Sequence, residues 1–145
     1  MYVDTAVNPA KTALNVMRVT VVVQLVMGAA FWMGRWTSTV DLHRTLGIVY
    51  VFALWLIAAL AIAHHHKKDV AGFAMIWGVL IITLGFAQQS ILPGEFHWIT
   101  RVAHLLIGIV AIPMAEDLVK GATMATARTR STTENAEKNS WPSAR

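Results

Sequence analysis

Two histidines, His43 and His104, are the residues of this chain best placed to do chemistry. Each stands at the edge of a long apolar segment, where an ionisable side chain is costly and is usually kept for pairing, transport or ligation. Two neutral imidazoles that face each other across a helix bundle are suited to hold the iron of one haem b. The pair therefore predicts His43 and His104 as metal ligands. A hydrogen bond from each histidine to a neighbouring helix is the alternative that the residues leave open.

The sequence around the two histidines repeats. His43-Arg-Thr-Leu-Gly47-Ile-Val and His104-Leu-Leu-Ile-Gly108-Ile-Val share the pattern H-x-x-[LI]-G-I-V, which indicates two copies of a helix pair. In each copy the glycine follows the histidine by four residues, so it lies on the same helix face one turn further on. The absent side chain of Gly47 or Gly108 leaves room for the edge of a flat macrocycle or for a close helix contact.

Arginines accompany both histidines. Arg44 follows His43 directly, and Arg101 precedes His104 by three residues on one helical stripe that also includes His97. Because guanidinium groups bind carboxylates in a fork geometry, both arginines can receive the propionates of a haem at the water boundary. The predicted cofactor-binding set, around one haem b per chain, is His43, His104, Arg44, Arg101, Gly47 and Gly108.

The elements that must position these residues are four apolar stretches. Of the 145 residues, 56% are hydrophobic and only 14% are charged, against roughly 25% in an ordinary soluble domain. Each stretch can form a helix of about 20 residues, which is long enough to cross a hydrocarbon core of about 30 Å. This balance excludes a soluble enzyme, and the lack of cysteine excludes disulfides, iron–sulfur clusters and covalently attached haem. The predicted fold class is an all-α integral membrane protein, a four-transmembrane-helix bundle made of two helix-pair repeats, with spans at Val19–Gly34, Thr45–His66, Val70–Gly94 and Val102–Ala115.

The charge distribution predicts an orientation. Short connections make neighbouring spans antiparallel, so both termini and the middle loop lie on one side of the membrane. That side carries most of the basic residues behind the net charge of +4, and the positive-inside rule makes it cytoplasmic. We therefore expect no nucleic-acid partner, but a multi-pass protein of the cell (inner) membrane with both histidines near the outer face. Its predicted segments are a cytoplasmic N-terminus at 1–11, a haem-binding bundle at 12–119 and a disordered cytoplasmic tail at 120–145.

The histidine segments resemble one half of the haem A synthase family, whose full-length members are duplicated. The resemblance covers about residues 12–118, and it implies an axial ligand pair at His43 and His104. The family carries a carboxylate three residues before the histidine of its active half, where this chain has Val40; Asp41 lies on a different helix face. The chain is more distantly similar to the cytochrome b561 family.

These features favour a membrane-embedded b-type cytochrome for electron transfer, acting as a homodimer or as a subunit of a larger respiratory complex among membrane lipids. A half-size haem A synthase-like enzyme acting as a dimer is one alternative, and a non-haem structural membrane subunit or small transporter is another. Gln88 and Gln89 offer interhelical hydrogen bonds or a quinone contact. The tract from His64 to His66 has two interpretations, a metal site or a solvated loop that faces anionic lipid.

Overall fold

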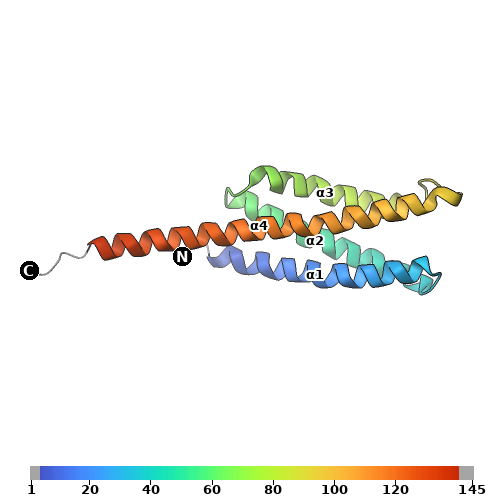
Figure 1. Cartoon of the computed structure of the whole chain (residues 1–145), viewed down its shortest axis with the longest axis horizontal. Helices are drawn as coiled ribbons and strands as arrows, with labels where there is room; N and C mark the ends of the chain where they lie inside the picture. Colours follow the sequence, from blue (N-terminus) through green and yellow to red (C-terminus); the bar gives the residue numbers. More distant parts are fainter. Residues whose placement is uncertain (1–3, 141–145) are drawn as a thin grey trace, which may run out of the picture.

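Four long helices and two short 3-10 turns make up the described part of this computed structural model, residues 4–140, with side chains described for residues 8–136. The long helices are α1 (Asp4–Trp32), α2 (Val40–Ala63), α3 (Lys68–Ala87) and α4 (His97–Ser140), and the turns are η1 (Thr37–Thr39) and η2 (Gly94–Phe96). No strand occurs within residues 4–140. Figure 1 shows the helices side by side, with α4 continuing past the other three.

The helices alternate in direction, as short connections require. One end of the bundle, here called the two-loop end, carries segments 33–39 and 88–96; the opposite, single-loop end carries segment 64–67 (Figure 1). Because α2 and α4 both begin at the two-loop end, they run parallel to each other. His43 and His104 therefore lie in early turns of their helices at the same end of the bundle, as predicted.

All four helices are long and apolar enough to cross a membrane; the qualifying segments are Asn8–Trp32, Thr37–Ala63, Lys68–Ala87 and Gly94–Ala136. Each helix also exposes large apolar side chains on its outer face, including Val22, Phe52, Ile76 and Leu106. In water such a continuous apolar exterior would be a liability, whereas lipid solvates it. The prediction of an all-helical chain with four apolar spans is confirmed.

The helix boundaries differ from the predicted spans. α1 begins at Asp4, so it extends through residues 4–11, before the predicted start of the bundle. α3 ends at Ala87, well before the predicted limit at Gly94. A residue that precedes proline avoids the helical conformation, and Leu92, just before Pro93, takes a positive φ of 49°. Gly94 follows with a φ of 83°, a value that glycine adopts without steric cost.

The segment expected to lack regular structure from about Gly121 is helical through Ser140. Its threonine hydroxyls are satisfied within the helix, because they donate to carbonyl oxygens one turn earlier: Thr123 to Val119 at 3.0 Å and Thr126 to Ala122 at 3.0 Å. The segment also contains alanine and arginine, which favour helix, and has no proline before position 142. The remainder of the predicted tail, residues 141–145, lies outside the described residues.

Most of the buried core lies in one half of the bundle. Of its largest fully buried side chains, Met17, Leu54, Ile57 and Leu118 lie toward the single-loop end, and Val51 lies at the middle of α2. Alanines pack between them and bring the helix backbones close together, as is common between membrane helices. Near the two-loop end the cluster includes Ile81 of α3, and few other described side chains there belong to it. That half of the bundle is therefore less densely packed.

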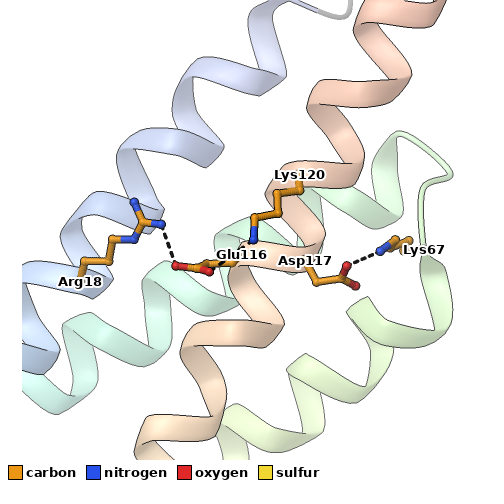
Figure 2. A network of polar contacts seen from close by, with 5 residues as sticks. All are labelled: Arg18, Lys67, Glu116, Asp117 and Lys120. Carbon is orange, nitrogen blue, oxygen red and sulfur yellow. Dashed lines mark hydrogen bonds and ion pairs between the residues drawn. The ribbon is translucent and has the colours of Figure 1, made fainter.

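Ion pairs fasten the single-loop end. Arg18 of α1 contacts Glu116 of α4 at 2.7 Å, Lys120 contacts the same carboxylate at 3.6 Å, and Lys67 pairs with Asp117 (Figure 2). Exposed ion pairs add little stability. Their main effect here is to align α1 and segment 64–67 with α4.

The histidine tract at this end is divided between solvent and the bundle. His64 and His65 are exposed, whereas His66 is partly buried against Gly121 of α4. A Cβ atom on Gly121 would lie only 1.8 Å from Nε2 of His66, so the glycine is needed for this contact. No group of three potential metal ligands forms among the described residues, here or elsewhere.

Candidate cofactor site

An open cavity of about 580 Å³ occupies the half of the bundle near the two-loop end. This volume falls within the range of about 300–1,000 Å³ that is typical of small-molecule and cofactor sites. Residues of all four helices line it. The wall includes every residue of the predicted cofactor-binding set, namely His43, Arg44, Gly47, Arg101, His104 and Gly108.

His43 and His104 reach this cavity from α2 and α4. Both side chains are partly buried, and the two imidazoles lie within range of electrostatic interaction. The Nδ1 atom of each is buried and has no hydrogen-bond partner among the described residues. Such a nitrogen also occurs on His66 and His97, so what distinguishes His43 and His104 is that two helices present them to one cavity within electrostatic range.

Neighbouring helices position the two rings. Phe31 of α1 meets His43 edge-on, with ring centroids 5.3 Å apart and planes at 71°. Gly85 of α3 accommodates His104, because a Cβ atom at Gly85 would lie 3.3 Å from Cε1 of the imidazole. Neither Phe31 nor Gly85 was predicted from the sequence as a neighbour of the histidines.

Gln24 connects α1 to the start of α2. Its Nε2 donates a hydrogen bond of 3.0 Å to the backbone oxygen of His43, which is the interhelical bond expected of a glutamine within a span. Its Oε1 is buried without a partner among the described residues, and the side chain lines the cavity. Gln24 thus fixes the backbone that carries His43 and leaves one acceptor at the cavity wall.

The two repeated glycines have different surroundings. A Cβ atom on Gly47 would lie 3.1 Å from Nε2 of Gln24, so Gly47 permits a close contact between α1 and α2. A Cβ atom on Gly108 would meet no atom within 4 Å, because Gly108 faces open space. The backbone oxygen of Gly108 accepts a hydrogen bond of 2.7 Å from Tyr50. Of the two roles considered for these glycines, Gly47 therefore fits close helix contact and Gly108 leaves room in the cavity.

The charged side chains on the cavity wall are basic. Arg101 is exposed, and Arg44 contacts Asp41 at 3.2 Å along the surface of α2. The Asp41 side chain is 92% exposed and is not on the wall, as its helical position predicts. Val40 is on the wall instead, and no aspartate or glutamate lines the cavity among the described residues. The cavity is therefore suited to a ligand with acidic groups.

A third histidine, His97, also lines the cavity. Its Nδ1 is buried without a partner in the described part of the chain. Gln88 and Gln89, where α3 ends, line the same wall. From the sequence, His97 was predicted only to share the helical stripe of His104. The arrangement thus provides one histidine pair within electrostatic range, with His97 and two amides elsewhere on the wall.

Comparison of the chain with protein-family models, with curated proteins and with solved structures gave no match. The resemblance to the haem A synthase family accordingly rests on the segments that contain His43 and His104.

Proposed function

We propose that this protein is a membrane-embedded b-type cytochrome that binds one haem b between His43 and His104. The observation that carries the proposal is the pair of partly buried imidazoles that α2 and α4 present to one cavity, within electrostatic range of each other. Arginines and a glycine that leaves open space line the same cavity.

The cavity wall suits a haem in three further respects. Its volume of about 580 Å³ lies in the cofactor range, and it opens where the buried core ends. Gly108 leaves open space at the wall, as the edge of a flat macrocycle requires. Arg44 and Arg101 provide the cations that propionates need. Haem iron takes its remaining nitrogens from the porphyrin, so a pair of histidines is a sufficient protein contribution.

Haem supplies reversible one-electron chemistry when bound, and the protein determines its reduction potential. In this chain the reduction potential would be set by two imidazole ligands, by partial burial and by the nearby arginines. His97, Gln88 and Gln89 are the residues on the wall that offer polar contacts to a redox partner with carbonyl groups, such as a quinone. We further propose that the chain works as a homodimer or within a larger respiratory complex.

The composition of the wall favours electron transfer over haem modification. An enzyme that oxidises a haem methyl group needs a carboxylate beside the iron, by the resemblance described above. Val40 occupies that position on the wall, and Asp41 points to solvent and contacts Arg44. The half-size haem A synthase remains the second candidate, because the histidine motif is the feature that the two functions share.

The distribution of basic residues supports an orientation with both termini in the cytoplasm, and hence a haem near the outer face of the cell (inner) membrane. The single-loop end carries Arg18, Lys67 and Lys120, together with further basic residues of the α4 extension. Positive residues are retained on the cytoplasmic side during insertion.

Co-purification of haem tests the proposal. The full chain is expressed in a respiring bacterial host, purified in mild detergent, and assayed for haem as the pyridine complex against protein concentration. We expect a ratio near one haem b per chain. Protein that is helical and monodisperse but free of haem, even after haem is added to the membranes, would contradict the proposal and favour a non-haem structural subunit.

A further inference from the structure

A separate groove, of about 410 Å³, lies between α1 and α4 at the single-loop end. Three cationic side chains line it, Lys11, Arg18 and Lys120, together with one carboxylate, Glu116. Neutral residues complete the wall: Leu14, Asn15, Val119, Thr123 and Met124. Nothing in the proposed haem function uses this groove.

The groove carries an excess of positive charge. Glu116 is shared by two cations, at 2.7 Å from Arg18 and 3.6 Å from Lys120 (Figure 2). Lys11 has no ion-pair partner within residues 8–136. The three cations therefore outnumber the one carboxylate, and an anion bound in the groove would find donors on two different helices.

The groove also lies at the boundary between polar and apolar surface. Lys11, Asn15, Arg18 and Val22 follow one another at helical spacing, so they form one stripe on α1. The stripe is polar in the groove and turns apolar beyond it, where Val22 is 60% exposed and Val26 54% exposed. A molecule with an anionic head group and hydrocarbon tails fits this stripe, with its head group at the polar part and its tails along the apolar part.

We propose that the groove binds the phosphate of an anionic phospholipid, with Lys11, Arg18 and Lys120 around the head group and the acyl chains along Val22 and Val26. Basic pockets between transmembrane helices are recurrent sites for anionic lipid head groups. This site is independent of haem binding, because it lies at the opposite end of the bundle from the histidines.

Native mass spectrometry of the full chain in detergent tests the proposal. The protein is titrated with phosphatidylglycerol, with phosphatidylcholine of the same acyl chains, and with inorganic phosphate as a competitor. The test variant is Lys11→Gln with Lys120→Gln. The matched control is Arg128→Gln with Arg130→Gln, which removes the same charge from the exposed α4 extension outside the groove.

We expect phosphatidylglycerol to bind more tightly than phosphatidylcholine. Removal of two groove cations should weaken phosphatidylglycerol binding by about 30-fold. Each basic residue near an anionic lipid surface contributes about fivefold, and the two contributions multiply. The control pair should change the affinity little, and Lys11→Arg with Lys120→Arg should retain it.

Three results would overturn the proposal. They are equal binding of the two lipids by the unmodified chain, equal losses in the two glutamine pairs, or displacement of phosphatidylglycerol by inorganic phosphate at similar concentrations, which would mean a free-phosphate site. Circular dichroism shows whether each variant has kept its helices, and the arginine pair separates lost charge from lost structure.

Discussion

The Tyr50 hydroxyl donates a hydrogen bond of 2.7 Å to the backbone oxygen of Gly108, and this bond joins α2 to α4 beside the cavity. Tyr50 belongs both to the buried core and to the cavity wall. It therefore lies at the boundary between the packed half of the bundle and the hollow half, and it ties together the two helices that carry His43 and His104.

Tyr50→Phe should destabilise the protein by about 1 kcal/mol, because the substitution removes one buried hydrogen bond and leaves the Gly108 oxygen without this donor. The measurement is the shift in the midpoint of thermal unfolding of the purified chain in detergent, followed by circular dichroism. An unchanged midpoint would mean that the bond does not hold α2 against α4.

Gly78→Ala should cost about 1–3 kcal/mol, because an added Cβ would lie 2.3 Å from Nε1 of Trp55 and displace an indole that donates to the Met75 oxygen at 3.0 Å. Gly72→Ala is the matched control on the same helix, since its Cβ would meet no atom within 4 Å. Alanine also favours helix, so the control should be neutral or slightly stabilising. Equal losses in the two variants would show that Trp55 does not pack against Gly78 as described.

The apolar stretches of the chain were sufficient to predict four long helices. Four uncharged stretches predicted four helices in alternating directions, and the repeated H-x-x-[LI]-G-I-V pattern placed His43 and His104 at one end of the bundle. All six predicted cofactor-binding residues then lie on one cavity wall. The direction of each helix and the four-residue spacing between histidine and glycine can both be read from the sequence. Neither depends on contacts between helices.

Other features depend on contacts between helices and could not be predicted. Gly85 and Phe31 reach the histidines from α3 and α1, and their roles follow from packing that no local pattern encodes. The helical extension beyond Gly121 was missed for a different reason. Its polar composition indicated disorder, but polar side chains can be satisfied within a helix, as the Thr123 hydroxyl is by the Val119 oxygen at 3.0 Å.

The orientation in the membrane can be tested with single cysteines, because the chain has none of its own. Cysteine at Ser131 should resist an impermeant thiol reagent in intact cells, and cysteine at Ser38 should react with it. The physical reason is the group of basic residues at the single-loop end, because the positive-inside rule favours the cytoplasmic side for such residues. The reverse labelling pattern would place the histidine cavity on the cytoplasmic side. Labelling of both variants after detergent lysis controls for accessibility.

The chain should hold haem b without converting it, because the cavity wall carries Val40 where the resembling family has a carboxylate. The measurement is acid extraction and chromatography of haems from a host that makes haem B and haem O but lacks its own haem A synthase. A haem A synthase expressed in the same host serves as the positive control. Recovery of haem A, or of its alcohol intermediate, from cells with this chain would identify it as an enzyme.

Reduced absorption spectra of the purified chain and of His43→Ala, His104→Ala and His97→Ala show whether the two histidines ligate haem iron. Loss of either axial ligand leaves the iron five-coordinate or unbound. We expect sharp low-spin α and β bands in the unmodified protein and in His97→Ala, and their absence in the other two. A normal bis-histidine spectrum in His43→Ala or in His104→Ala would contradict this ligand assignment.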